Sequence, residues 1–321
     1  MIERAELVEA FLADSPWRNW SRTALAGDAS ARRYLRLTDQ EQSVILMDAA
    51  PQNGEDTKPF AQIASLLHAK SLCAPDILAH DPVAGLMVLS DLGEDDFARW
   101  LADQPADAPK LYRAATDVLI RLQEIEPPEN LTWMTPAVGA DMIGIIGTHY
   151  AKGPTQDLCA EMERALTRLA PAPTTLALRD YHAENLIWRA DRSGTDRVGL
   201  LDFQDAFIAP AGYDLASLLR DARRDVPQSI VDDCIAYYAT RTNVDTDFPA
   251  AVACLGVQRN LRIMGVFARL ATEQGKTRYL RFMPRVWSHI VQDLENPALA
   301  DLRQAVRDTI PAPTHVEEAA T

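Results

Sequence analysis

The chain is poor in the residues that several classes of protein require. Its four cysteines, at positions 73, 159, 234 and 254, show no C-x-x-C spacing, which argues against a disulfide scaffold or a zinc site. No apolar run approaches the roughly 20 residues that a membrane-spanning helix needs. The first residues are rich in Glu and lack the basic and then apolar order of a secretory signal. We therefore expect a cytoplasmic protein with no membrane partner.

Basic residues are also scarce. Lys and Arg number 32 against 46 Asp and Glu, which gives a net charge of −14. Non-specific binding to nucleic acid needs clustered positive charge, so a nucleic-acid partner is not expected. The 321 residues are 47% hydrophobic, which is ample for a packed core in one large unit or two smaller ones.

The most informative stretch is residues 178–205. Asp180, His182 and Asn185 stand just before the apolar run L-I-W, and Asp202 closes the apolar run V-G-L-L. A polar D-R-S-G-T-D turn separates the two runs, so the pattern predicts a hairpin of two short buried strands with acids at both ends. Asp and Asn are common turn and capping residues, and the D-x4-N spacing alone would occur by chance. The flanking strands favour the functional interpretation.

This pattern is typical of phosphoryl transfer. A carboxylate must orient an acceptor hydroxyl, and oxygen ligands must hold Mg²⁺ against the phosphates of ATP. We expect Asp180 to be the catalytic base, and Asn185 and Asp202 to be the metal ligands.

Residues 26–37 and 42–51 predict two strands joined through a turn, as in a phosphate-binding loop, although only one glycine is present. Gly27, Asp28 and Ser30 could direct amides at phosphate, and a plain hairpin turn is equally consistent. The strand at residues 44–48 lacks the Lys that kinases use to bind phosphates. Arg32, Arg33 or Arg36 could supply that charge, or could form exposed ion pairs.

Periodicity predicts a helix at residues 57–72 and strands near 77 and at 85–89, with helices from residue 97 onward. Residues 178–185, L-R-D-Y-H-A-E-N, resemble the catalytic loop of aminoglycoside phosphotransferases and other protein-kinase-like small-molecule kinases. The usual form of that loop is H-G-D-x-H-x-x-N. Leu178 and Arg179 depart from it, which argues against the antibiotic-resistance enzymes themselves.

The resemblance implies an α+β, bilobal fold with a small antiparallel-sheet lobe at residues 1–92 and a mainly helical lobe at 93–321. It implies a hinge at Ser90 and Leu92 whose backbone meets adenine. It also implies that His182, Asp205 and Asp214 support the catalytic loop, although Asp214 alone reads equally well as a helix cap.

Further segments, such as Y-D-L-A-S-L-L-R-D-A and Q-R-N-L-R-I-M-G-V-F-A-R-L, resemble the cell-wall-recycling kinases that phosphorylate N-acetylmuramate and N-acetylglucosamine at the anomeric hydroxyl. An amino sugar is therefore the expected substrate. Its lactyl carboxylate calls for an arginine, and the candidates are Arg179, Arg220, Arg223, Arg224, Arg259 and Arg262. The alternatives are an aminoglycoside, choline or other amino-alcohol kinase, and a nucleotide-binding pseudokinase scaffold, which the missing Lys favours and the intact D-x4-N opposes.

Overall fold

The computed structural model of the chain describes residues 3–25 and 32–313. Three residues expected to bind phosphate, Gly27, Asp28 and Ser30, lie outside this part. The chain divides into two compact units, here called the sheet unit (residues 1–96 and 187–204) and the helical unit (residues 97–186 and 205–321). The sequence led us to divide the chain at Leu92 and to expect the hairpin in the second lobe. In the structure, the contacts of residues 187–204 group the hairpin with the sheet.

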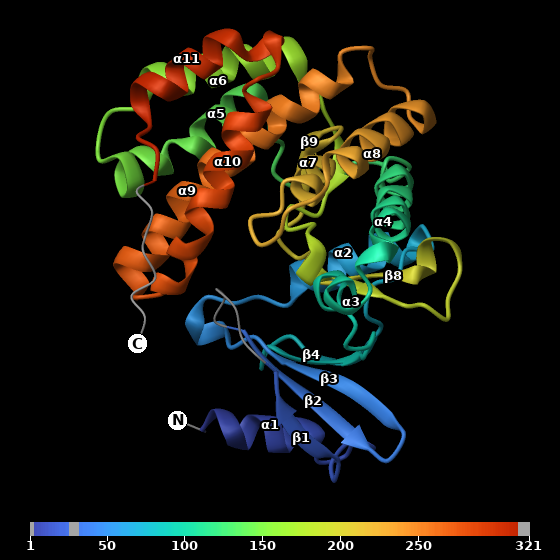
Figure 1. Cartoon of the computed structure of the whole chain (residues 1–321). Helices are drawn as coiled ribbons and strands as arrows, with labels where there is room; N and C mark the ends of the chain where they lie inside the picture. The colour runs from blue at the N-terminus through green and yellow to red at the C-terminus, as the bar shows by residue number, and fades with distance from the viewer. Residues whose placement is uncertain (1–2, 26–31, 314–321) are drawn as a thin grey trace. The chain divides into compact units, whose positions relative to one another are not determined.

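Five antiparallel strands form the sheet, in the order β1-β2-β3-β5-β4 (Figure 1). Their bounds are β1 (Ser21–Ala24), β2 (Arg33–Asp39), β3 (Gln42–Asp48), β4 (Ile77–Asp81) and β5 (Leu86–Ser90). The expected α+β class, with an antiparallel sheet in the first part of the chain, is confirmed. The strand β1 was not expected, because its sequence S-R-T-A is short and polar and its burial pattern is mostly exposed.

Helix α1 (Arg4–Leu12) supplies Val8 and Leu12 to a core under the sheet. The sheet residues in this core recur at alternate positions because successive side chains on a strand point to opposite faces. They are Leu37, Val44, Leu46, Leu86 and Val88. The helix ends before Pro16, as the sequence predicts.

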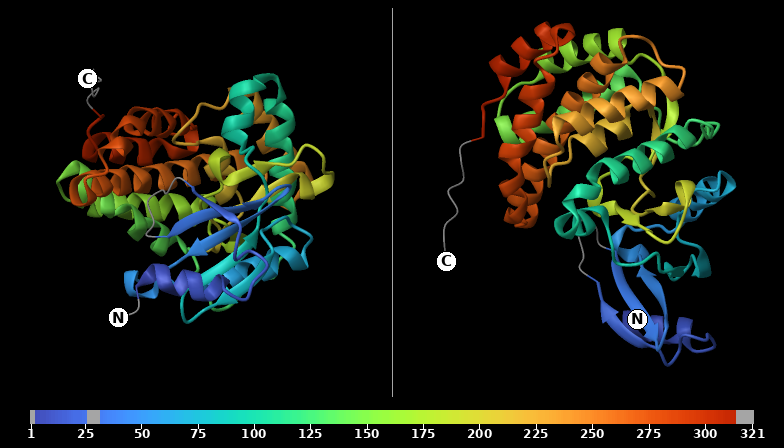
Figure 2. Two further views of the ribbon diagram at one scale, coloured as in Figure 1. Left: turned by 90° about the horizontal axis from the view of Figure 1, so that it is seen from below. Right: turned by 45° about the vertical axis from the view of Figure 1, so that its right-hand side comes forward.

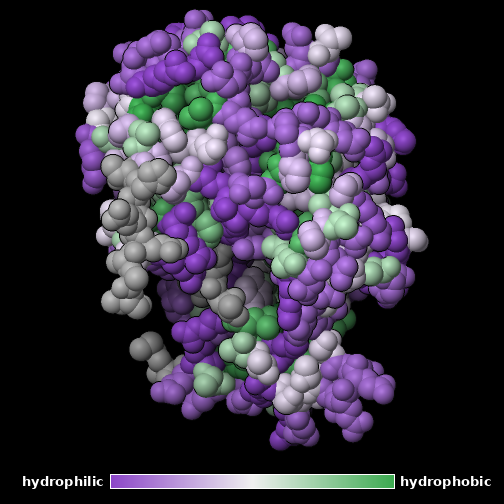
Figure 3. All heavy atoms as spheres, in the orientation of Figure 1, coloured by the Kyte–Doolittle hydropathy of each residue, from purple (hydrophilic) through white to green (hydrophobic). Residues whose placement is uncertain are grey.

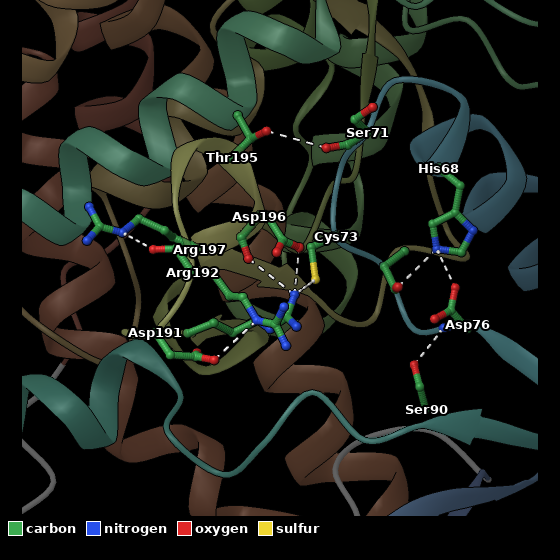
Figure 4. Close-up of polar contacts among 12 residues, drawn as sticks. His68, Ser71, Cys73, Asp76, Ser90, Asp191, Arg192, Thr195, Asp196 and Arg197 are labelled. Carbon is green, nitrogen blue, oxygen red and sulfur yellow. Dashed lines mark hydrogen bonds and ion pairs between the residues drawn. The ribbon is translucent and has the colours of Figure 1, made fainter.

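The predicted hairpin is present as β7 (Leu186–Trp188) and β8 (Val198–Leu200). The backbone N–H of Leu200 donates to the carbonyl of Cys73 at 2.7 Å, and a 4.7 Å ring stack joins Phe203 to Phe60 of α2 (Lys58–Ala69). Figure 4 shows how the loop between the strands is held, with the Thr195 hydroxyl donating to the carbonyl of Ser71 at 3.4 Å. These contacts explain why the hairpin groups with the sheet unit.

The helical unit is built around α9, a 27-residue helix that packs against α5, α6, α7 and α10 (Figure 2). Its helices are α3 (Phe97–Asp103), α4 (Ala108–Leu122), α5 (Pro136–Ile143), α6 (Gln156–Leu169), α7 (Tyr213–Leu219), α8 (Gln228–Arg241), α9 (Phe248–Gln274), α10 (Met283–Asp293) and α11 (Ala300–Thr309). A π-helical turn spans Gly147–Ala151. The short 3-10 turns of the chain are Pro51–Asn53, Pro105–Asp107, Ala183–Asn185, Gly194–Arg197, Thr277–Phe282 and Pro297–Leu299.

A two-stranded antiparallel pair, β6 (Pro173–Ala177) with β9 (Phe207–Pro210), lies in the helical unit and was not expected from the sequence. Its importance is positional, because β6 ends directly before Leu178, where the predicted catalytic loop begins.

Within residues 3–25 and 32–313, no helix is both long and apolar enough to cross a membrane. The face shown in Figure 3 is largely hydrophilic, with small apolar areas among the polar side chains.

Gly85 yields a test of packing in the sheet unit. It has φ +67°, and a Cβ atom there would lie 2.1 Å from the carbonyl oxygen of Ala49 and 2.8 Å from Pro51 Cδ. Gly54 has a similar φ of +80° with nothing within 4 Å of the same position, so Gly54→Ala is a matched control. Both variants carry the cost of a left-handed backbone, and Gly85→Ala adds the clash. We expect Gly85→Ala to lower the free energy of unfolding by about 1–3 kcal/mol more than Gly54→Ala in chemical denaturation. Equal losses would contradict this account.

Candidate active site

The loop that carries Asp180 is anchored by the carboxylate of Asp214. The backbone N–H groups of Leu178 and Arg179 donate to its two oxygens at 2.6 and 3.0 Å. Arg179 has φ 75°, a left-handed conformation that costs a non-glycine residue free energy. Two hydrogen bonds beside it, with a third at 3.4 Å from the Ser217 hydroxyl to the Arg179 carbonyl, hold this conformation. The direction in which the next residue, Asp180, leaves the loop is therefore fixed by Asp214.

Asp214 is itself buried, in the first turn of α7. Burial raises the pKa of its carboxyl to about 7, while the two backbone N–H groups and the nearby Arg259 act in the opposite direction. A carboxylate that accepts two backbone hydrogen bonds is best satisfied when ionised. Gly212 is the N-cap residue of α7, so the interpretation of Asp214 as a helix cap is wrong; its carboxylate bonds the loop instead.

The carboxylate of Asp180 is half-buried, and no hydrogen bond or ion pair joins it to another residue in the described part of the chain. Its backbone carbonyl is engaged instead, because Asn185 Nδ2 donates to it at 2.9 Å. The same Nδ2 lies 3.3 Å from His182 Nε2. Because Nδ2 makes these contacts, and no residue in 3–25 or 32–313 donates to Oδ1, the amide oxygen of Asn185 can accept a further bond.

His182 is buried within the loop, and Arg223 Nη1 lies 3.2 Å from its Nε2. Burial, together with the positive charges of Arg223 and Arg259, holds the pKa of His182 well below its usual value. The ring is therefore neutral at physiological pH and accepts at Nε2. Arg223 also pairs with Glu184 of the same loop at 2.7 Å. Through its contacts with Arg223 and Asn185, His182 supports the shape of the loop.

The sheet unit contains a group of charges of its own around Arg32. Its Nε lies 2.8 Å from Glu55, and both side chains are nearly buried, at 11% and 13% exposed. Arg32 Nη1 also lies 4.0 Å from the carboxylate of Asp202. Burial first, and then the charge of Asp202, raise the pKa of Tyr34 to about 12, with Arg32 opposing them. Arg32 is thus a buried cation held between two carboxylates.

The other arginines of this region are placed differently. Arg36 donates from Nε to Asp91 at 2.7 Å and also pairs with Glu94, so its charge is already matched. Arg33 is exposed on β2, opposite Asp48 in the register. Of the three candidates, Arg32 alone stands beside Asp202.

The two residues expected at the hinge, Ser90 and Leu92, differ in whether their backbone groups are already bonded within the sheet. The N–H of Ser90 donates to the carbonyl of Asp76 at 2.9 Å, and its hydroxyl accepts from the N–H of Asp76 at 2.8 Å. Leu92 lies beyond the end of β5, and its side chain packs where a Cβ on Gly199 would come within 2.9 Å. The backbone donor of Ser90 is therefore used inside the sheet unit, and Leu92 lies outside the sheet.

One residue predicted to support the loop makes no such contact, and two residues that were not predicted do make contacts at the site. Asp205 is exposed, and no hydrogen bond to another described residue is seen for its side chain. Asp221, which the sequence did not single out, accepts from the N–H of Ala183 at 3.3 Å and braces the loop from below. Glu55 was also missed, because it stands alone in a polar turn and no spacing connects it to Arg32.

The oxygen donors suit a hard cation. Asn185 presents Oδ1, and the Asp202 carboxylate is 45% exposed with Gln204 Nε2 donating to it at 2.8 Å. Mg²⁺ bound together with nucleotide phosphates takes one or two protein ligands of this type. In residues 3–25 and 32–313, no three His, Cys, Asp or Glu side chains gather into a metal-binding group. By its chemistry, each of these two side chains, one in either unit, is a ligand that a nucleotide-associated Mg²⁺ accepts.

Comparison with known protein families gives a decisive match. Residues 21–250 match the model of the phosphotransferase enzyme family, which covers more than half of the chain. The chain belongs to this family. The match includes the strands around Arg32, the catalytic loop and the hairpin. Family membership makes the protein a small-molecule kinase that uses ATP.

Two relatives are similar over most of their length. A Caulobacter vibrioides protein named N-acetylmuramate/N-acetylglucosamine kinase is 36% identical, over 97% of this chain and 98% of its own. A Pseudomonas aeruginosa protein of the same name is 32% identical, over 86% and 85%. Among solved structures, a choline/ethanolamine kinase family protein from Mesorhizobium loti aligns with a TM-score of 0.64 at 15% identity, over 95% of this chain and 100% of that one. That last similarity shows the shared fold.

The anchoring role of Asp214 leads to a stability test. Asp214→Asn replaces one acceptor oxygen with an NH₂ group that faces a backbone N–H, so one hydrogen bond is lost and a donor is left unpaired. We expect this variant to lower the free energy of unfolding by about 1–3 kcal/mol and to speed hydrogen exchange at Leu178 and Arg179. The control Asp205→Asn changes an exposed carboxylate and should alter stability by at most about 0.5 kcal/mol. A similar small change in both variants would show that Asp214 does not anchor the loop.

Proposed function

We propose that the protein transfers the γ-phosphoryl group of ATP to the anomeric hydroxyl of an N-acetylated amino sugar, N-acetylmuramate or N-acetylglucosamine. The observation that carries the chemistry is the carboxylate of Asp180, which no residue of the described part of the chain bonds, on a loop fixed by Asp214. The acceptor is supported by the names of two relatives that align over most of this chain. Fold similarity to choline kinases at 15% identity does not favour an amino alcohol.

In this proposal Asp180 accepts the proton of the sugar hydroxyl as that oxygen attacks phosphorus. A carboxylate without a competing partner can orient the hydroxyl before reaction and take its proton as the bond forms. The neutral His182 and the carbonyl of Asp180 fix Asn185 through its Nδ2. Most of the rate in phosphoryl transfer comes from such positioning and from neutralising charge.

Asn185 and Asp202 are the proposed ligands of Mg²⁺, which neutralises charge on the phosphates when it is bound with ATP. Chain connectivity supports the assignment, because Asn185 directly precedes β7 and Asp202 follows shortly after β8, the partner strand in the same hairpin. Asp202 has φ 56°, a left-handed conformation that non-glycine residues adopt mainly at constrained sites.

Arg32 is the proposed substitute for the missing strand Lys. Its pairing with Glu55 holds a buried cation in place, and its guanidinium presents further donors for phosphate oxygens. Gly27, Asp28 and Ser30 precede it in the chain and remain proposed phosphate contacts. Arg33 is a weaker candidate, because it is exposed on the strand.

Leu92 is the better of the two proposed adenine contacts, since the N–H of Ser90 is already bonded to Asp76. A cytoplasmic location is also part of the proposal. All four cysteines are free thiols, which suits a reducing compartment, and ATP is the expected phosphoryl donor.

The function is tested by incubating the protein with ATP, Mg²⁺ and each sugar, with ADP release and loss of reducing-sugar reactivity as readouts. Phosphorylation at the anomeric oxygen blocks ring opening, so the product should no longer reduce. Asp180→Asn should keep its fold and nucleotide binding while turnover falls by about 10²–10⁴-fold. Turnover of the variant near that of the wild type would remove Asp180 from its role.

The acceptor panel also includes kanamycin, choline and no acceptor. Phosphorylation of kanamycin or choline with neither sugar accepted would replace the proposed substrate and leave the kinase class. Nucleotide binding without turnover of any acceptor would favour a scaffold protein instead.

Arg32 is tested through the Michaelis constant for ATP. Arg32→Ala should raise this KM by about 10- to 100-fold, the size expected when a charge-assisted hydrogen bond to phosphate is lost. Arg36→Ala is the matched control, because this arginine lies four residues further along the chain, on β2, and is paired with Asp91 and Glu94. An unchanged KM in a folded Arg32→Ala protein, or equal increases in both variants, would refute the substitution.

A further inference from the structure

Helix α9 presents two arginines, Arg259 and Arg262, on one face. They are three residues apart, which places them one above the other on a helix. Arg259 is only 5% exposed, and its Nη1 has no hydrogen-bond partner. Within the described part of the chain, no ion pair joins either guanidinium to a carboxylate.

Unpaired buried cations are unusual. Removing a charged group from water costs several kcal/mol unless a partner of opposite charge or a set of hydrogen bonds replaces the solvent. Helix α7 packs on α9, and the charges around Arg259 and Arg262 include further positive charge from Arg179. Burial, and then the charge of Arg179, hold the pKa of Arg262 below its usual value. Arg179, Arg259 and Arg262 therefore form a set of three neighbouring cations, here called the arginine cluster.

The carboxylates near the arginine cluster are already assigned to other tasks. The charge of Asp180, on the catalytic loop, acts to raise the pKa of Arg262. The charge of Arg259 acts to lower the pKa of Asp214, whose carboxylate accepts the N–H groups of Leu178 and Arg179. Burial raises the pKa of Tyr213, and all three arginines of the cluster oppose that shift, so its phenol remains neutral and adds no negative charge. The cluster thus has an excess of positive charge beside Asp180.

Two other arginines of the helical unit are matched by carboxylates within it. Arg220 pairs with the buried carboxylate of Asp293 at 2.7 Å, and Arg223 pairs with Glu184 at 2.7 Å. Arg224 Nη1 donates to the carbonyl of Phe97 at 3.4 Å, and its Nε has no partner in the described part of the chain. Arg220 and Arg223 are thereby set aside, and the three arginines of the cluster are considered together because all three act on Tyr213.

We propose that Arg259 and Arg262, with Arg179 beside them, bind a carboxylate of the phosphoryl acceptor. The proposal rests on the proposed function, since it places an anionic acceptor beside Asp180. Guanidinium groups recognise carboxylate by paired, charge-assisted hydrogen bonds, and an anion would supply the opposite charge that the cluster lacks. N-acetylmuramate carries such a carboxylate on its lactyl ether, and N-acetylglucosamine carries none. The cluster is then a specificity site that favours the charged sugar and disfavours a polycationic antibiotic.

The same positive charge would suit a phosphate of ATP, so the experiment separates the two anions. Steady-state kinetics of the full-length enzyme are measured with N-acetylmuramate, its carboxamide and N-acetylglucosamine, and with varied ATP. The carboxamide keeps the shape of the lactyl group and removes its charge. The variants are Arg262→Gln, which is half-buried, and Arg259→Lys, which keeps the charge but loses the planar fork. Arg113→Gln, at an ion pair with Asp233 on the surface, is the matched charge control.

The wild type should prefer N-acetylmuramate over its carboxamide by about 10- to 100-fold in kcat/KM. Arg262→Gln should lower kcat/KM for N-acetylmuramate by a similar factor, with the carboxamide and N-acetylglucosamine changed by no more than about threefold. The KM for ATP should stay unchanged, and Arg113→Gln should resemble the wild type.

Any of four results would overturn the proposal for the cluster. The first is a wild type that does not distinguish the carboxylate from the carboxamide. This result needs no variant, so misfolding of a variant cannot affect it. Equal losses for all three sugars would give the arginines a structural role, and a raised KM for ATP would assign the cluster to the nucleotide. A wild type that phosphorylates neither sugar would instead overturn the proposed function, and with it the anionic acceptor. If the wild type phosphorylates N-acetylglucosamine and Arg262→Gln keeps the wild-type preference between the two sugars, the proposal for the cluster is rejected and the proposed function stands.

Discussion

The bond between the buried carboxylate of Asp214 and the two backbone N–H groups of Leu178 and Arg179 is the constraint on which the helical unit's chemistry depends. It joins the end of β6 to the start of α7, and it holds one residue in a left-handed conformation. Without it, the residue that follows would be free to point its carboxylate in several directions. Asp221, which follows α7, also holds this loop, through the N–H of Ala183. Two buried acids thus hold the loop that carries Asp180, the residue proposed as the base.

The sheet unit follows a similar logic with the charges reversed. Arg32 is a cation held by Glu55, and Asp202 lies within 4.0 Å of it. A charged group that is already partly desolvated and fixed by a partner loses little further entropy when it meets a phosphate. The absence of a strand Lys therefore does not leave this region without an ordered positive charge. The guanidinium stands directly before β2, the strand next to β3, and it is one of the three arginines that the sequence offered for this role.

Local signals predicted much of the fold. The apolar runs on either side of the D-R-S-G-T-D turn predicted β7 and β8, and the spacing of Phe60, Ile63 and Leu67 predicted α2, because each pattern is contained within a few residues. The D-x4-N spacing together with these strands pointed to Asp180 and Asn185, whose roles stay a prediction. The pairing of β6 with β9 was not predictable in this way, since about thirty residues separate two short segments with no shared signature. Glu55 and Asp221 were missed for the same reason: their partners are defined by tertiary contact, and isolated acids in polar turns are common. Resemblance to a kinase loop suggested Asp214 as a support but equally suggested Asp205, and only the fold separates the buried residue from the exposed one.

The left-handed backbone of Arg179 has a consequence for how such a loop can evolve. The related loop form H-G-D carries glycine at this position, and glycine adopts a positive φ without steric cost. An arginine in the same conformation gives up roughly 1 kcal/mol or more of stability relative to that alternative. A residue that breaks a local conformational rule in this way is expected mainly at functional sites. The left-handed backbone at Arg179 thus accompanies a guanidinium one residue from Asp180. A glycine at this position would relieve the backbone and would remove one of the three positive charges on this side of the loop.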